Sequence, residues 1–518
     1  MRRGRMRERA SREGRRLRGA LALAALLACA PAAATNGYFA HGYSAAQRAL
    51  GGAGTALTED ALVATINPAG AAWVGERLDI NLSLFAPARG YLAGPVGSGA
   101  QNSILRIGED APASWNPRYY IPGFAYVAPI DEVSSWGIAV YGNGGLNTEY
   151  HGNIAHFAEG FAVGAGPVNL VNLQTQCAGS YGGGQPVNGA SDSGGFCGKG
   201  NPVAQVDLIQ LFIAPHYARK FGATSSIGIA PIVAGQRFRA DGLKAFAQFS
   251  NAPDKVSDNR YDLSYGYGGR VGVLTGAIPG FGFGASYQTR IRMSPFKKYQ
   301  GLFAGGGDFD VPSSWNLGLS AHPTAGLSLA YDFQRINFSE IKSVGNRFDP
   351  NDFVNNCARP RLLAALGFGG STDPSDSCLG AATGPGFGWR DVSVHKFGIQ
   401  YRLSAVTLRA GYSQTHQPIP QSEVLFNILA PAVIEKHYTV GASYALNPSW
   451  GLDFTGMYAP GHPVVGKNPL SNTSASAADL VLGAPSNQTA FGEDANDQDI
   501  QLDMHQYEIT VGLSYRFQ

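Results

Sequence analysis

Four of the five cysteines form two local pairs, and paired cysteines either bind a metal or form disulfides. Cys177 pairs locally with Cys197, and Cys357 with Cys378, in stretches rich in Gly, Ser and Asn. A zinc site would use closer CxxC spacing or neighbouring histidines, so it is disfavoured. In an exported chain we expect loop disulfides 177–197 and 357–378, although four cysteines allow three connectivities.

Other residue types that carry chemistry show no catalytic spacing. The ten histidines are scattered without an HExxH motif, and no GxSxG motif is present. The glycine-rich stretches 51–54 and 266–272 lack the GK[ST] ending of a phosphate loop. The acidic stretch 492–499 could bind a divalent cation, but it lacks the EF-hand glycine and is interpreted as a solvated loop. We therefore expect no catalytic residue, metal or cofactor, and a protein that is not an enzyme.

The first 34 residues resemble an export signal. Residues 1–18 contain nine Arg and two Glu, and the uncharged apolar stretch 19–30 precedes the small residues Ala32, Ala33 and Ala34. This order is typical of a secretory signal peptide, and cleavage is expected after Ala34. The sequence "LLAC", which ends at Cys29, leaves a lipoprotein signal as the alternative. A membrane anchor is disfavoured because a spanning helix needs about twenty apolar residues.

Charge excludes one class of partner. Removing the leader, which carries +7, turns the net charge of +2 for the whole chain into −5. Without a basic patch, the mature chain is not expected to bind nucleic acid.

Segments of about ten residues with alternating side chains recur along the mature chain, as in transmembrane β-strands. In "HQYEITVGLSYRF" one face carries Tyr507, Ile509, Val511, Leu513, Tyr515 and Phe517, and the other carries Glu508, Thr510, Gly512, Ser514 and Arg516. One face is apolar with aromatic ends, as expected for contact with lipid, and the other is polar, as expected for a lumen. The inward set includes Arg290, Arg292, Arg402, Arg409, Arg516, Asp332 and Glu508, which could bind a lumenal segment or a carboxylate head group.

Fourteen such strands are predicted, so the fold class is an all-β, antiparallel transmembrane β-barrel. The expected strands are 78–90, 119–129, 135–144, 204–221, 224–240, 262–277, 280–292, 313–322, 324–341, 388–404, 405–417, 431–447, 448–461 and 499–517. Short turns follow the even strands, and the longer loops include 91–118, 145–203, 342–387 and 462–498. This arrangement is typical of a Gram-negative outer-membrane barrel with periplasmic termini. Outer-membrane lipids, lipopolysaccharide and the barrel assembly machinery are then the expected partners of a monomer.

Residues 35–77 precede the first strand and are expected to fill the lumen as a plug. Their sequence "NGYFAHGYSAAQRALGGAGTALTEDALVATINPAG" resembles the start of the FadL-like outer-membrane transporters of long-chain fatty acids and hydrocarbons. The likeness includes "GGAGTAL" at 51–57, Asp60 and "NPAG" at 67–70. It continues through "VPSSWNLGLS" at 311–320, "YDFQRINFSEI" at 331–341 and the last strand.

The resemblance implies a hatch at 35–77 inside a barrel formed by 78–518. It implies a ligand pocket near the mature N-terminus, at Thr35, Asn36, Gly37, Tyr38 and Phe39, and a hatch motif at Asn67, Pro68 and Ala69. It also implies a kink with lateral release in the third strand, where Gly142, Asn143, Gly144 and Gly145 lie. The alternative is that these glycines only begin the long loop.

The expected function is passive uptake of a long-chain fatty acid or another apolar small molecule. One alternative is a general diffusion porin for hydrophilic solutes, which would not need residues 35–77. The other is an outer-membrane lipid hydrolase, for which neither a nucleophile nor a base is found.

Overall fold

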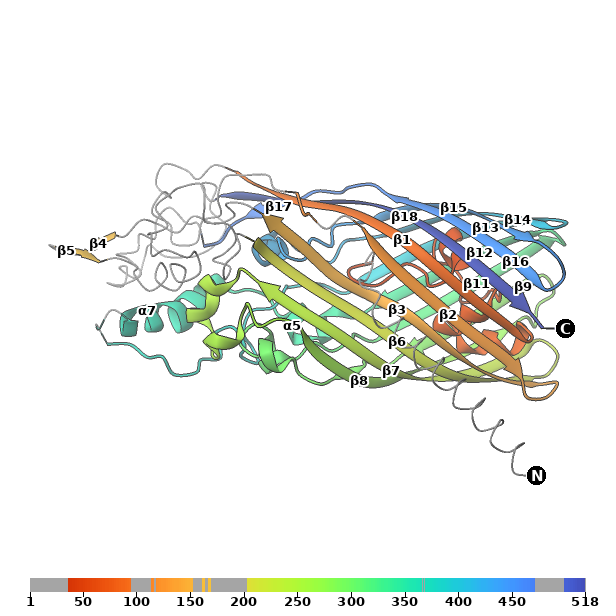
Figure 1. Cartoon of the computed structure of the whole chain (residues 1–518), viewed down its shortest axis with the longest axis horizontal. Coiled ribbons are helices and arrows are strands. Elements are labelled where there is room, and N and C mark those ends of the chain that lie inside the picture. The colour runs from red at the N-terminus through yellow and green to blue at the C-terminus, as the bar shows by residue number, and fades with distance from the viewer. Residues whose placement is uncertain are drawn as a thin grey trace, which may run out of the picture.

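The computed structural model describes residues 36–94, 113–115, 118–151, 203–365, 367, 369–470 and 498–517, and only the backbone of 161–163 and 166–168. Over these residues, fourteen strands form a closed antiparallel barrel, because β1 pairs with β2 on one side and with β18 on the other (Figure 1). In order around the barrel they are β1 (Arg77–Ala93), β2 (Tyr119–Pro129), β3 (Ser134–His151), β6 (Val203–Phe221), β7 (Ser225–Asp241), β8 (Asp262–Thr275), β9 (Phe281–Gln288), β11 (Ser314–Thr324), β12 (Leu327–Ile336), β13 (Val392–Leu403), β14 (Val406–Thr415), β15 (Lys436–Ala445), β16 (Trp450–Ala459) and β18 (Asp499–Arg516). The predicted number of strands is confirmed.

The predicted alternation of side chains is also confirmed. On β18, Ile509 and Val511 are each 49% exposed, whereas Glu508 and Thr510 are buried. A closed barrel pairs the backbone of every spanning strand, so it needs no water inside the bilayer. The apolar outer face then contacts lipid, and the polar inner face contacts whatever fills the lumen.

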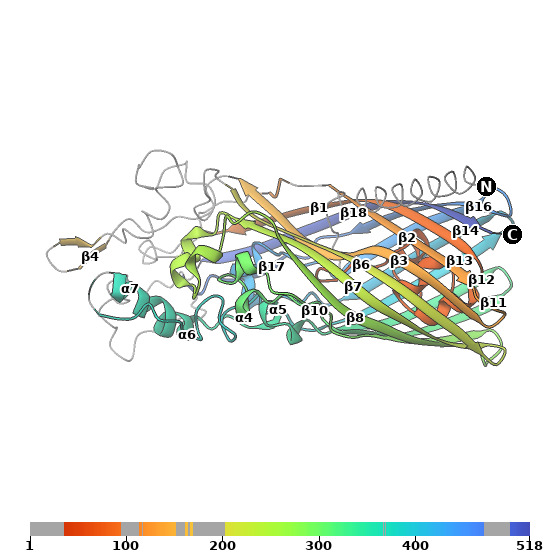
Figure 2. The same cartoon turned by 60° about the horizontal axis from the view of Figure 1, so that its bottom comes forward.

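The two ends of the barrel differ in their connections. Short turns follow the strands at even positions around the barrel, at the end where the C-terminus lies. The longer loops extend from the other end (Figures 1 and 2). These loops carry the short strand β10 (Arg292–Met293), which pairs with β8, β17 (Val464–Lys467), which pairs with β18, and the hairpin of β4 (Phe161–Val163) and β5 (Gly166–Val168). Their helices are η4 (Lys244–Phe249), η5 (Pro253–Lys255), η6 (Lys297–Tyr299), α4 (Ala304–Gly307), η7 (Phe338–Glu340), α5 (Lys342–Gly345), α6 (Pro350–Phe353), η8 (Val354–Ala358), α7 (Arg359–Ala365), η9 (Gln421–Glu423) and α8 (Val424–Asn427). Within the described residues, no helix is long and apolar enough to cross a membrane.

Several predicted strand ends are wrong. β3 continues to His151 instead of ending at 144, so residues 145–151 are strand and not loop. β12 ends at Ile336 instead of 341, because the chain turns into η7 and buries Phe338 and Ile341 fully in the interior. β13 and β15 begin at Val392 and Lys436, later than expected, and β11 runs to Thr324 instead of ending at 322.

The prediction for Arg292 is wrong as well. β9 ends at Gln288, and the chain resumes pairing with β8 only at Arg292, opposite Tyr267. The extra residue reverses the alternation, because a one-residue shift moves each side chain to the other face. Ile291 is fully buried, and Arg292 is exposed instead of facing the lumen.

Residues 36–76 fill the lumen as a hatch, as expected for this fold. The hatch contains α2 (Ala45–Ala49), η1 (Ala61–Thr65) and η2 (Pro68–Trp73). It lies inside the barrel toward the end with the short turns (Figure 1). The expected signal peptide, with Cys29, lies outside the described residues.

Candidate functional site

The first described residues of the hatch lie in an aromatic cluster. The Tyr38 side chain is fully buried, with its ring centroid 5.3 Å from that of Phe338, 5.9 Å from Trp389 and 6.0 Å from Phe309. Phe39 packs edge-on against Phe338 at 5.8 Å. We call Tyr38, Phe39, Phe309, Phe338 and Trp389 the aromatic box. It consists of aromatic side chains packed on one another, a lining that suits an apolar ligand.

The glycine cluster of β3 forms a β-bulge at the same place. The register between β3 and β6 shifts between Gly142 and Gly144, so Asn143 is the extra residue. The hatch pairs with this bulge, because the Ala40 N–H donates to the Asn143 carbonyl (3.0 Å) and the Gly145 N–H donates to the Tyr38 carbonyl (3.1 Å). A Cβ on Gly144 would lie 1.6 Å from the Tyr38 carbonyl oxygen, so this contact requires glycine.

Two groups of predicted residues therefore meet. Asn36, Gly37, Tyr38 and Phe39 lie beside the bulge, and the glycines lie within the strand instead of starting a loop. Thr35 lies outside the described residues.

Next to the bulge, β2 and β3 separate. Their ladder runs from Pro129 and Ser135 to Gly123 and Tyr141 and ends there, although β2 stays paired with β1 as far as Tyr119. Pro122, the next residue of β2, has no N–H to continue the ladder. In the described chain this leaves the barrel wall without backbone pairing between 119–122 and 142–147.

Side chains close part of this gap. Arg89 donates to the Tyr119 hydroxyl at 2.8 Å and to the Asn147 carbonyl, and Tyr119 also contacts the Asn147 side chain. A small cavity lies behind them, lined by Gly37, Phe85, Leu146, Pro431 and Met504 among others. The start of the hatch thus lies directly inside the gap.

A second apolar cavity lies among the loops. Its volume is about 70 Å³, and Ser343 is its one polar side chain among the lining residues of the described chain. Its walls come from four loops and the barrel rim, and they include Phe238, Phe246, Leu302, Leu379, Phe387 and Phe426. We call it the loop pocket.

The loops around this pocket are joined to one another. Cys357 and Cys378 form a disulfide, and the Leu379 N–H donates to the Phe249 carbonyl at 3.0 Å, which ties this loop to the β7–β8 loop. Glu423 of the β14–β15 loop accepts from the Phe348 N–H at 3.1 Å, and burial raises the pKa of its carboxyl. Cys177 and Cys197 lie outside the described residues.

The NPA motif fixes the hatch to the wall. The Asn67 side chain donates to the carbonyls of Thr55 (2.8 Å) and Val273 (2.9 Å), and it accepts from the Ala69 N–H. Gly228 leaves space for Pro68, because a Cβ there would lie 2.3 Å from the Pro68 carbonyl carbon. The motif is thus an anchor of the hatch to β7 and β8.

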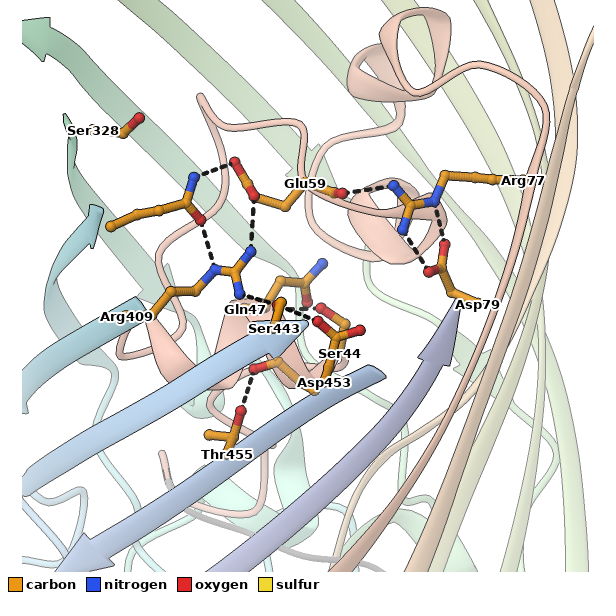
Figure 3. Close-up of polar contacts among 12 residues, drawn as sticks. Ser44, Gln47, Glu59, Arg77, Asp79, Ser328, Arg409, Ser443, Asp453 and Thr455 are labelled. Atoms are coloured by element: carbon orange, nitrogen blue, oxygen red, sulfur yellow. Dashed lines mark hydrogen bonds and ion pairs between the residues drawn. The ribbon is translucent and has the colours of Figure 1, made fainter. Parts of the chain in front are cut away.

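Charged lumen residues anchor the rest of the hatch. Arg409 pairs with Glu59 at 3.0 Å in a network with Ser443 and Asp453 (Figure 3). Glu508 pairs with Arg48 at 3.0 Å, and Asp332 accepts from the Gly54 and Thr55 N–H groups at 2.9 Å.

The remaining residues that were predicted to face the lumen do not contact the hatch in this way. Arg402 and Arg516 line a polar cavity of about 300 Å³ beside the short turns. Arg290 pairs with Asp308 and Asp310 in the β9–β11 loop. Burial, together with the neighbouring Asp310, raises the pKa of Asp308 to about 6.

A family profile described as "Outer membrane protein transport protein (OMPP1/FadL/TodX)" matches residues 21–481. The chain belongs to this family. It is therefore a protein of the Gram-negative outer membrane, and its family consists of transport channels for hydrophobic compounds. No protein of curated function matches its sequence significantly.

Solved structures share the fold of this outer-membrane transport protein. The P. putida toluene transporter TodX is 15% identical, with a TM-score of 0.57 over 92% of this chain and 99% of that one. A Pseudomonas aeruginosa FadL homologue is 12% identical, with a TM-score of 0.57 over 93% and 100%. The Ralstonia pickettii toluene transporter TbuX is 15% identical, with a TM-score of 0.51 over 92% and 99%.

Sequence reasoning missed much of the transport protein's candidate site. Phe309, Phe338 and Trp389 follow or precede strands far apart in the chain, and only the folded loops bring them around Tyr38. Phe338 and Trp389 lie inside the predicted strands 324–341 and 388–404, so the alternation gave no signal of a cluster around Tyr38. The glycines of β3 indicate only one side of the gap between β2 and β3, and Pro122 of β2 lies on the other side.

Proposed function

We propose that this protein takes up apolar small molecules passively and releases them sideways into the outer membrane. A ligand binds first in the loop pocket, passes to the aromatic box and leaves through the gap between β2 and β3. The proposal rests on two contacts that Tyr38 makes at the start of the hatch. Tyr38 lies in the aromatic box, and its carbonyl accepts from Gly145 at the bulge.

The energetics favour this route for an apolar cargo. Burying each CH₂ group is worth about 0.8 kcal/mol, so transfer of an apolar molecule from water into the protein or into lipid is downhill. Neither ATP nor a cofactor is needed. A ligand that enters the aromatic box displaces the Tyr38 ring, and the backbone carbonyl of the same residue contacts Gly145 beside the gap.

The nature of the cargo follows from the site. The box and the loop pocket offer aromatic and aliphatic walls, which suit a long-chain fatty acid or an aromatic hydrocarbon. Two of the similar structures are described as toluene transporters and one as a FadL homologue. A porin for hydrophilic solutes is disfavoured, because the hatch fills the lumen.

A disulfide across the gap tests lateral release. A Cβ on Gly142 would lie 3.1 Å from Ile121 Cγ2, so cysteines at 121 and 142 are close enough to join. Under oxidation we expect I121C/G142C to bind an apolar ligand at the cell surface but to lose most of its uptake, and reduction should restore it. I121C alone is the control. Unchanged uptake by the fully oxidised double variant would rule out exit through this gap.

A further inference from the structure

The reversed alternation after β9 gathers positive charge on the outside of the barrel. Arg292 is exposed beside Tyr267, and Lys297 and Lys298 follow it in the chain. Lys298 donates to the Tyr261 carbonyl at 2.7 Å, which places the segment along the loop end of β8. β7, β8 and β10 lie side by side there (Figure 2). We call Arg292, Lys297, Lys298 and the exposed Tyr261, Tyr265 and Tyr267 the rim patch.

The rim patch lies where the apolar band ends. Outward side chains of β7 are apolar from Ile227 to Val233, and after Gly235 they are Arg237 and Arg239. About ten residues of a tilted strand cross the hydrocarbon, so a band that begins near Ser225 ends near Gly235, which pairs with Tyr265. Tyr265 and Tyr267, 62% and 73% exposed, then lie at the level of the lipid head groups.

The cations at this level differ in their partners. Arg237 and Arg239 are neutralised by Asp207 and Asp241. Arg292 and Lys297 have no acidic partner among the described residues. Two carboxylates near the segment are held by backbone N–H groups. Asp262 accepts from Leu263 (3.0 Å) and Lys298 (2.8 Å), and Asp310 accepts from Met293 (2.6 Å). The rim patch therefore keeps positive charge beside the outer leaflet.

We propose that the rim patch binds a phosphorylated glycolipid head group of the outer leaflet. Arg and Lys are the side chains that bind phosphate, and basic groups at the interface bind anionic lipid heads. Arg292 lies level with Tyr267 and Lys298 with Asp262, which are about 17 Å apart along the strand. This spacing suits a head group that bears more than one phosphate better than a single phosphate ion. Exposed Val271 and Val273 below would contact its acyl chains.

Titration of the purified full-length barrel with bis-phosphorylated lipid A, followed by native mass spectrometry, tests the proposal. We expect Arg292→Ala with Lys298→Ala to weaken binding about tenfold. The exchange Arg292→Lys with Lys298→Arg should retain it. A charge-matched control is Lys342→Ala with Lys436→Ala, which lie outside the patch and should bind as the unmodified protein does. A heat-dependent electrophoretic shift verifies that each variant is folded.

Two further arms distinguish the sources of the phosphate. Fully dephosphorylated lipid A should bind the unmodified protein no better than it binds the Ala double variant, and inorganic phosphate should not compete at equal concentration. Equal binding by the Ala double variant, or an equal loss in the control, would overturn the proposal. Equally tight binding of dephosphorylated lipid, or displacement by inorganic phosphate, would overturn it too.

Discussion

At Gly144 a single hydrogen atom in place of a side chain lets the hatch pair with the barrel wall. The added Cβ of any other residue would meet the Tyr38 carbonyl at 1.6 Å. The backbone of β3 is held by its pairing with β6, and the backbone of the hatch is held by the aromatic box. A side chain at position 144 would therefore force one of these two backbones to shift. Gly456 on β16 provides a comparison, because a Cβ there meets nothing within 4 Å.

We predict that Gly144→Ala leaves the barrel folded but changes uptake of a radiolabelled apolar solute at least several-fold. The substitution pushes Tyr38 away and breaks the hydrogen bond to Gly145. The larger Gly144→Trp should block uptake while leaving binding at the cell surface intact. Gly456→Ala, the matched control, should transport normally. Normal uptake by both Gly144 variants would mean that the ligand does not pass this bulge.

The family resemblance and the residue types together predicted part of this site. A cluster of glycines inside a strand indicated the bulge, because strand positions ordinarily carry side chains. The hatch residues that contact it came from a family resemblance, and nothing in the spacing of Tyr38 and Gly144 links them. Contacts between segments this far apart in the chain depend on the closed barrel, which single-sequence patterns do not specify.

At the scale of elements, period-2 alternation identified the strands because lipid and lumen impose opposite demands on their two faces. The alternation did not predict correctly where strands end in the loops outside the membrane. Phe338 and Ile341 follow β12 and are as apolar as strand residues, but they pack into the interior between loops. The bulge after Gln288 was missed for a similar reason, because arginine is compatible with the lumen and with the outer rim.

The disulfide loop provides a prediction at this scale. Peptide mapping of the oxidised protein should find Cys357 linked to Cys378 and Cys177 linked to Cys197. Linking a loop of about twenty residues is worth roughly 3 kcal/mol in the chain-entropy model. We expect Cys357→Ser with Cys378→Ser to leave the barrel folded but to weaken ligand capture several-fold, because Leu379, which lines the loop pocket, follows Cys378 directly.

Calorimetric titration of an apolar ligand measures this effect, and reduction of the unmodified protein should reproduce it. Cys177→Ser with Cys197→Ser is the matched control for the loss of a loop disulfide. Free thiols at all four positions in protein isolated from the outer membrane would contradict the pairing.

For the whole molecule, the relation between hatch and barrel makes a further prediction. Deleting residues 36–70 removes no barrel strand, and the wall charges Arg409, Glu508 and Asp332 would become hydrated instead of buried without partners. We expect the deletion variant to fold and to conduct ions steadily in planar bilayers, whereas the intact protein should not. Steady conductance by the intact protein would contradict a sealing hatch.

The glycine contacts of the hatch also bear on the circumference of the barrel. Glycines on five different wall strands leave the space that hatch atoms occupy. They are Gly228, Gly272, Gly284, Gly411 and Gly441. A barrel with one hairpin more or fewer would have a different radius and could not present all of these glycines to the same hatch. The contacts of the hatch therefore fit only a barrel with this number of strands. Insertions should be tolerated in the loops but not as extra strands.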